Sequence, residues 1–123
     1  VNIFRGTPYP FPLTISMMEK HPLGSQFFMP LDPFDYLVAV AEAKSTVLPE
    51  DVLIFSCSHK KGVNFKPGVW HHPLLVLAEQ QDFLVIDRAG AGENLVEQDL
   101  ASQIMVDLDE NNPQGRLEPR PRQ

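Results

Sequence analysis

Two ionisable side chains, Glu19 and His21, lie two residues apart in an apolar stretch just before the turn formed by residues 22–25. Side chains alternate along a strand, so both point to one face, and the short turn lets Gln26 on the returning strand reach the same region. Alternation also assigns three apolar side chains to this face: Leu13, Ile15 and Met17. A carboxylate and an imidazole on an apolar face are costly to bury without a partner, ligand or metal. A solvated or mutually hydrogen-bonded Glu-His pair is the alternative.

Two adjacent histidines, His71 and His72, follow Trp70 and a Pro67-Gly68 turn. Adjacent residues on a strand face opposite sides, so we expect only one of the two imidazoles to join an interior site, and the sequence leaves open which one. An imidazole titrates near neutral pH and can serve as a general base, a general acid or a metal ligand. Trp70 itself is expected in the core.

Two basic residues are candidates for holding an anionic substrate. Arg88 follows the segment FLVID, and a guanidinium can grip a carboxylate with two parallel hydrogen bonds, although a structural pair with Asp87 is an equal alternative. Lys66 precedes the Pro67-Gly68 turn, where a solvated surface charge is the alternative to a substrate contact. The segment 90–92, Gly-Ala-Gly, lacks the third glycine and the following helix of a dinucleotide-binding loop, so we reject that interpretation.

These residues must be positioned by strands, because twelve prolines and seven glycines leave few intervals long enough for a helix. Apolar alternation bounded by turn residues predicts strands over 1–5, 13–21, 26–30, 36–41, 52–56, 69–78 with Pro73 interrupting, and 83–87. The connection 41–51 is expected to hold one helical turn at most, and 93–108 a helical turn followed by a last strand. Such short strands in series predict a β-sandwich or a closed barrel, whose interior often holds one small ligand.

The 123 residues fit one domain, which we place at residues 1–106, followed by a mobile polar tail at 107–123. The net charge of −6, with no Lys/Arg cluster beyond Lys60-Lys61, argues against nucleic acid as a partner. No apolar run is long enough to span a membrane. The single cysteine, Cys57, is expected as a buried small side chain and fits a reducing, cytoplasmic compartment. Because the sequence opens without Met and in a strand-like pattern, we expect part of the N-terminal segment to be missing.

Three strings occur in order over residues 13–90: LTISMMEKHPLGSQFFMPLD, GVNFKPGVWHHPLL and DFLVIDRAG. Together they resemble the ureidoglycolate lyase family, formerly called ureidoglycolate hydrolase, of the cupin superfamily. The resemblance implies an all-β, cupin-like double-stranded β-barrel (jelly roll) and a homodimer. It also implies cleavage of (S)-ureidoglycolate to glyoxylate and urea in allantoin and purine catabolism. Members of the family carry a further stretch before the strand that begins here.

The resemblance also implies a metal site that departs from the usual cupin pattern. A metal-binding cupin presents two histidines separated by one residue, then a glutamate, and a third histidine from a later strand. Here those positions are filled by Glu19, His21, Gln26 and His71. Glu19, His21 and His71 are therefore the candidate set for a divalent ion, with nickel the metal associated with the family. Gln26 is a poorer ligand than a carboxylate.

In the mechanism that we expect, a base takes the hydroxyl proton of ureidoglycolate and an acid protonates the departing urea nitrogen. His21, His71 and Glu19 are the expected catalytic residues. Four further side chains are expected to contact the substrate: Gln26, Lys66, His72 and Arg88. One alternative is a non-catalytic cupin-like module that binds a small carboxylic acid. Another is a structural dimer module whose interior is filled by side chains.

Overall fold

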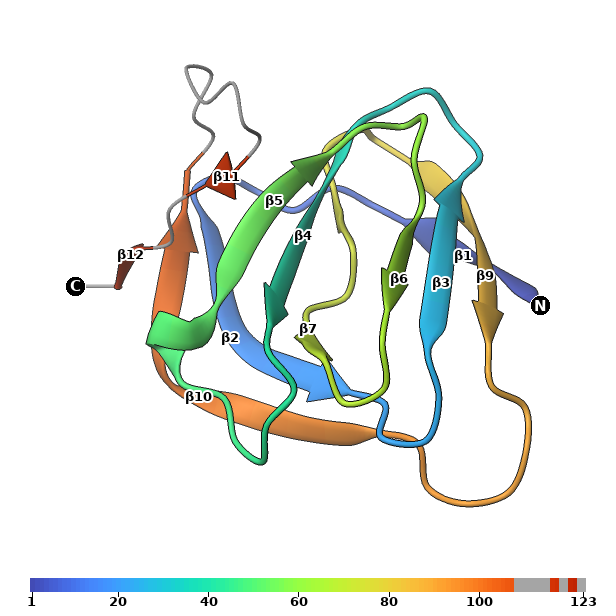
Figure 1. Ribbon diagram of the computed structural model, residues 1–123. Helices are drawn as coiled ribbons and strands as arrows, with labels where there is room; N and C mark the ends of the chain where they lie inside the picture. Colours follow the sequence, from blue (N-terminus) through green and yellow to red (C-terminus); the bar gives the residue numbers. More distant parts are fainter. Residues whose placement is uncertain (108–115, 118–119, 122–123) are drawn as a thin grey trace.

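The computed structural model describes residues 1–107, 116–117 and 120–121, which form twelve strands and one short 3₁₀ helix (Figure 1). The elements are β1 (Asn2–Gly6), β2 (Leu13–Lys20), β3 (Gln26–Pro30), β4 (Tyr36–Ala41), η1 (Pro49–Asp51), β5 (Leu53–Cys57), β6 (Val63–Phe65), β7 (Trp70–His71), β8 (Leu75–Val76), β9 (Gln81–Asp87), β10 (Val96–Val106), β11 (Arg116–Leu117) and β12 (Arg120–Pro121). The described residues contain no helix long and apolar enough to cross a membrane.

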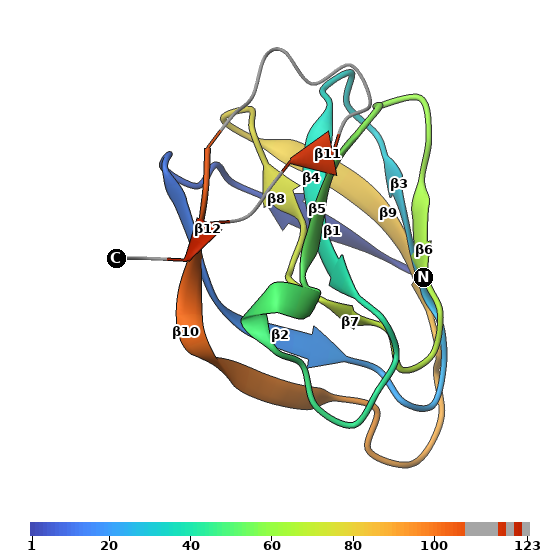
Figure 2. The ribbon, with the colours of Figure 1, turned by 60° about the vertical axis from the view of Figure 1, so that its left-hand side comes forward.

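The strands form two antiparallel sheets. The smaller sheet has the order β1-β9-β3-β6, and the larger one runs β11-β5-β4-β7-β2-β10-β12, with β8 paired beside β4. Figure 2 shows the larger sheet curving from β5 through β4 and β7 to β2 and β10. Two packed antiparallel sheets with one curled around its own face make a jelly-roll-like barrel. The predicted all-β fold class is confirmed.

The curled sheet produces two apolar cores. The curled-sheet core is formed by strands of the larger sheet, with Val47 and Val52 added from the connection between β4 and β5, and it includes Ile15, Leu37 and Ile54. The inter-sheet core lies between the two sheets and is rich in aromatic rings, including Phe28 and Phe83. β4 contributes to both cores because successive side chains of a strand point to opposite faces. Its near-continuous apolar sequence, YLVAVA, is therefore buried on both sides.

One predicted face assignment in β2 is wrong. Leu13 and Ile15 are buried in the curled-sheet core as alternation predicts, but the next buried side chain is Met18, not Met17. The pairing of β2 with β10 shifts register opposite this point, and such irregularities disturb the alternation of side chains. Glu19 consequently lies on the face opposite Met18. It points into the space between the sheets instead of sharing a face with Ile15.

Other differences from the predicted elements are local. β6 was not predicted, because Gly62 and the Pro-Gly turn obscure a three-residue strand. The segment predicted to open with a helical turn instead forms the long strand β10 from Val96. The one helical turn expected in the 41–51 connection is present as η1. Cys57 is half-buried and packs against the inter-sheet core, where burial raises the pKa of its thiol.

The predicted mobile tail, 107–123, lies mostly outside the described residues. Of that segment the structure describes Asp107 and two dipeptides, and the dipeptides pair with strands of the larger sheet. β11 pairs with β5, and β12 pairs with β10.

Candidate active site and metal centre

A cavity of about 290 Å³ lies between the two sheets. The larger sheet contributes Glu19 from β2 and His71 from β7, and His21 follows β2. The smaller sheet contributes seven lining residues: Asn2, Phe4, Gln26, Phe28, Phe65, Val85 and Asp87. Cavities of this size suit a small metabolite rather than a macromolecule. The filled interior expected of a purely structural module is absent from this part of the described chain.

The cavity brings together Glu19, His21 and His71, which we call the triad. Glu19 and His71 are direct partners in the pairing of β2 with β7, so their side chains share a face. The distance from His71 Nε2 to Glu19 Oε1 is 3.6 Å, and the imidazole centroids of His21 and His71 are 5.1 Å apart. One potential ligand atom from each of the three residues lies within 4.8 Å of the others. The predicted convergence of these side chains is confirmed.

Backbone carbonyls fix the tautomers of both triad imidazoles. His21 Nδ1 donates to the carbonyl oxygen of Asn94 at 2.7 Å, and His71 Nδ1 donates to that of Val69 at 3.2 Å. A carbonyl only accepts, so each Nδ1 carries the hydrogen and each Nε2 of the neutral ring carries a lone pair. Both Nε2 atoms are buried and have no hydrogen-bond partner among the described residues. The site therefore presents two unsatisfied nitrogen lone pairs beside a carboxylate.

Burial shifts the pKa values of His71 and Glu19 in opposite directions. It lowers the pKa of His71 to about 4, helped by the neighbouring imidazoles and opposed by the hydrogen bond to Val69. Burial also raises the pKa of Glu19, where Glu97 adds to the increase and His21 opposes it. At neutral pH His71 is thus a neutral imidazole, and Glu19 accepts a proton more readily than an exposed carboxylate.

Phe65 holds the plane of the His71 ring. The two rings stack with centroids 4.2 Å apart and an interplanar angle of 3°. Phe65 comes from β6, the strand that the sequence reading missed, and it is buried in the inter-sheet core. The sequence signal that could have found it is the alternation of Val63 and Phe65 around Asn64.

His72 also lines the cavity, so the prediction that only one of the two adjacent histidines faces inward is wrong. β7 ends at His71, and strand alternation does not extend beyond it. His72 is 8% exposed, its Nδ1 donates to the Pro73 carbonyl at 2.9 Å, and its ring contacts Tyr9 with centroids 5.9 Å apart. It stands apart from the triad, because the group of potential ligands does not include it.

The two predicted cations lie outside the cavity. Lys66 and Arg88 are both exposed, and neither is among the described residues that line the cavity. Each directly follows the last residue of a strand, Phe65 of β6 or Asp87 of β9. The Arg88 side chain instead packs against Gly24, where an added Cβ would approach Arg88 Cβ to 2.7 Å. The structure therefore does not place them where they would hold a carboxylate bound beside the triad.

Gln26 lines the cavity as predicted, and its partner is Asp87. The two residues are opposite each other in the pairing of β3 with β9, and Gln26 Nε2 donates to Asp87 Oδ2 at 3.3 Å. Asp87 was considered only as a partner for Arg88, so its place on the cavity wall is new information from the structure.

Asn94 is a further residue that sequence reasoning missed. Besides the bond from its carbonyl to His21, its side-chain Oδ1 accepts a hydrogen bond from the backbone N–H of Leu23 at 2.8 Å. The loop before β10 is thereby tied to the turn that carries His21. No sequence pattern signals this contact, because it joins segments more than 70 residues apart.

Comparison with known proteins identifies the family of this chain. The model of the family described as "Ureidoglycolate lyase" matches residues 1–107. The chain belongs to this family. A protein named ureidoglycolate lyase from Burkholderia mallei (strain NCTC 10229) is 46% identical over 106 residues, covering 86% of this chain and 62% of that protein.

Two further relatives carry the same name. The one from Azotobacter vinelandii is 50% identical over 94 residues, covering 76% of this chain and 57% of that protein. The one from Pseudomonas syringae pv. syringae is 42% identical over 115 residues, covering 94% of this chain and 68% of that protein. The chain thus spans about three-fifths of the length of the first two relatives.

Proposed function

We propose that this chain carries the active site of a ureidoglycolate lyase, which cleaves (S)-ureidoglycolate to glyoxylate and urea in allantoin and purine catabolism. Membership of the family supports the activity. The observation that supports the site most strongly is the pair of buried, unpartnered Nε2 atoms of His21 and His71 beside the Glu19 carboxylate. Buried polar atoms are nearly always hydrogen-bonded, so two unsatisfied lone pairs in one cavity call for a ligand.

The three side chains of the triad fit a divalent metal ion. Two imidazole nitrogens and one carboxylate suit zinc, nickel and related first-row metals, and the carbonyl bonds at Nδ1 are the outer contacts that orient metal-binding histidines. We propose that Glu19, His21 and His71 hold such an ion, and the family resemblance suggests nickel. When bound, an ion there would supply Lewis acidity toward a substrate oxygen.

When no ion occupies the triad, the protein's own groups can move the protons that the reaction requires. Cleavage converts the hydroxyl of the central carbon to a carbonyl, breaks the bond from that carbon to the urea nitrogen, and leaves the electron pair on the nitrogen, which gains a proton. His21 Nε2 carries a lone pair that can take the hydroxyl proton, whereas the lowered pKa of His71 makes it a weaker base. Glu19, with its raised pKa, can carry that proton to the departing nitrogen.

The test is release of glyoxylate from (S)-ureidoglycolate by the purified protein, measured before and after treatment with a chelator. Loss of activity with the chelator and its recovery with added Ni²⁺ supports the metal-dependent reaction. Activity that resists the chelator supports acid-base chemistry by the side chains alone. Absence of turnover, with a small carboxylic acid still bound in calorimetry, refutes the lyase and supports the binding module.

We further propose that the protein acts as a homodimer in the cytoplasm, following the family resemblance. Sedimentation equilibrium of the purified protein tests the first statement. A single species at the monomer mass of 13.9 kDa would contradict it.

A further inference from the structure

The wall of the cavity opposite the triad carries a second polar pair. Gln26 and Asp87 come from adjacent strands of the smaller sheet, whereas Glu19 and His71 come from the larger one. Asp87 is exposed and also lines the cavity, so it stands at the cavity mouth. It is not part of the group of potential metal ligands, which leaves its carboxylate for another role.

Gln26 braces this carboxylate on one side. Its Nε2 donates to Asp87 Oδ2 at 3.3 Å, and Oδ1 remains to accept a hydrogen bond from a molecule in the cavity. Arg88 is exposed, packs against Gly24 and is not among the described residues that line the cavity, so it does not compete for Oδ1 from within the cavity. The mouth therefore presents a negatively charged acceptor, held in place, to a ligand that reaches the triad.

Ureidoglycolate has two chemically different ends that match the two walls. Its carboxylate and hydroxyl offer oxygen atoms, which suit the triad side with a bound cation. Its ureido end carries N–H donors and a single carbonyl acceptor, and an amide N–H donates well to a carboxylate. No Lys or Arg is among the described residues that line the cavity, so nothing on the Asp87 wall favours the substrate's carboxylate there.

We propose that Asp87, braced by Gln26, accepts a hydrogen bond from the terminal amide of the ureido group and so selects substrates that carry one. This inference rests on the proposed function, because it assigns the ureido end of that substrate to the smaller sheet. A hydrogen bond to a charged acceptor contributes enough to change affinity by about tenfold or more.

The test compares two stable ligands that lack the hydroxyl and cannot be cleaved: N-carbamoylglycine and N-acetylglycine. They differ only in that a methyl group replaces the terminal amide. By calorimetry we expect the unmodified protein to bind N-carbamoylglycine about tenfold more tightly, and Asp87→Ala to bind both ligands equally. Asp82→Asn is the matched control, since Asp82 lies on the same strand but is paired with Arg5 on the outside and does not line the cavity.

Kinetics provides the second measurement. With (S)-ureidoglycolate, Asp87→Ala should raise KM about tenfold, while inhibition by glyoxylate, which has no ureido group, stays unchanged. The proposal is overturned if Asp87→Ala weakens inhibition by glyoxylate as much as it raises the KM for (S)-ureidoglycolate. It is also overturned if the unmodified protein binds N-carbamoylglycine no more tightly than N-acetylglycine. If the protein does not cleave ureidoglycolate but prefers N-carbamoylglycine in an Asp87-dependent manner, the lyase proposal fails and the ureido-binding role of Asp87 stands.

Discussion

The curled-sheet core and the inter-sheet region share β4, but only the second contains the cavity that holds the triad. The first is packed with apolar side chains from Leu13 to Val106 within the described residues. The second combines an aromatic core with a cavity of about 290 Å³ and two buried histidines, His71 and His72. Dense apolar packing stabilises a fold, whereas a cavity lined by unsatisfied polar atoms lowers stability in return for a binding site. Stability and activity should therefore respond to mutations in different regions.

The largest expected effect is on stability, in the curled-sheet core. Ile54 is 0% exposed there, and Ile54→Ala removes packed methyl groups and leaves a cavity. We expect the free energy of unfolding to fall by about 2–5 kcal/mol, measured by urea denaturation. Glyoxylate release per folded molecule should stay close to that of the unmodified protein. Ile86→Ala is the matched control, because Ile86 is 47% exposed and should change the unfolding free energy little. A comparable loss in both variants would contradict the assignment of the core.

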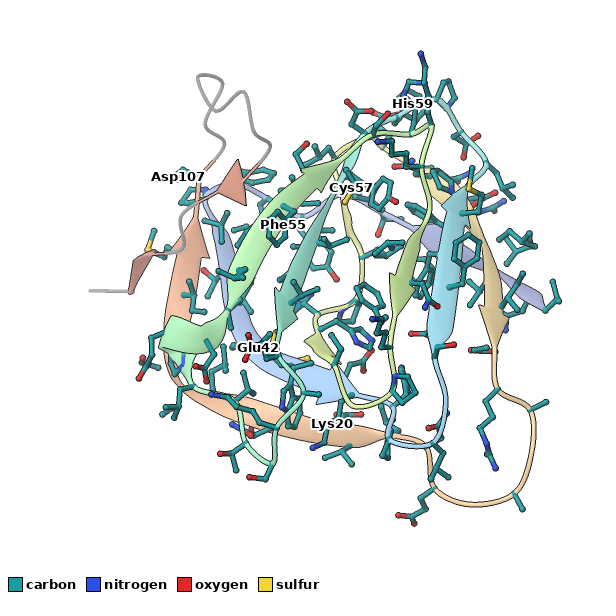
Figure 3. All side chains as sticks on the ribbon, viewed as in Figure 1. Lys20, Glu42, Phe55, Cys57, His59 and Asp107 are labelled. Atoms are coloured by element: carbon teal, nitrogen blue, oxygen red, sulfur yellow. The ribbon has the colours of Figure 1, made fainter. Side chains whose placement is uncertain are left out.

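The second effect is on activity, in the inter-sheet region. His21→Ala and His71→Ala should each lower the rate of urea release at least about 100-fold, because each removes a lone pair of the triad. His59→Ala is the control. His59 Nδ1 lies 3.0 Å from Asp35 Oδ1. Figure 3 shows His59 at the opposite end of the molecule from Lys20, and Lys20 is the residue between Glu19 and His21 in the sequence. Circular dichroism checks folding. Retained activity in both triad variants would remove these histidines from the mechanism.

The contrast between the regions also explains what the sequence could and could not predict. Alternation and turn residues located β3 and β4 with the bounds that the structure has, because their pairing follows local patterning. The triad residues were predicted to meet from the family resemblance, and they do. Alternation failed at Met17, where pairing with β10 changes register, since a shift of that kind depends on a distant strand. It failed again at His72, where the strand has already ended.

The details that tune the site are those that sequence patterns do not encode. The Asn94 carbonyl that sets the His21 tautomer is brought to it by tertiary packing across 73 residues. Likewise, the place of Asp87 on the cavity wall depends on which face of β9 turns inward. Residue types therefore indicated which chemistry was available, and the packing of two sheets decided which side chains share a cavity.

The third effect is a smaller loss of stability, at the margin of the curled-sheet core. The Gln98 side chain accepts a hydrogen bond from the N–H of Val47 at 2.9 Å and donates to the Val47 carbonyl at 2.7 Å. Gln98→Ala leaves both partly buried backbone groups without this partner, and we expect a cost of about 1–3 kcal/mol in urea denaturation. Activity should be unchanged. Ser102→Ala, at an exposed position of the same strand, tests whether the effect belongs to position 98. An equal loss of stability in both variants would show that the loss does not come from the two bonds to Val47.

The smallest expected effect is at the ring that braces the triad. Phe65→Leu keeps an apolar side chain in the inter-sheet core but loses the parallel stack on His71. Because such ring pairs contribute about 0.5–1.5 kcal/mol, we expect the affinity for added Ni²⁺ to fall about three- to tenfold, measured by competition with a chromogenic chelator. Phe28→Leu is the matched control: Phe28 lines the same cavity and packs edge-on against Phe65, with no ring contact to His71 among those described. Both variants should lose similar stability, since both remove a ring from one core. Equal loss of Ni²⁺ affinity in the two would mean that the inter-sheet core as a whole, rather than the stacked ring, positions His71.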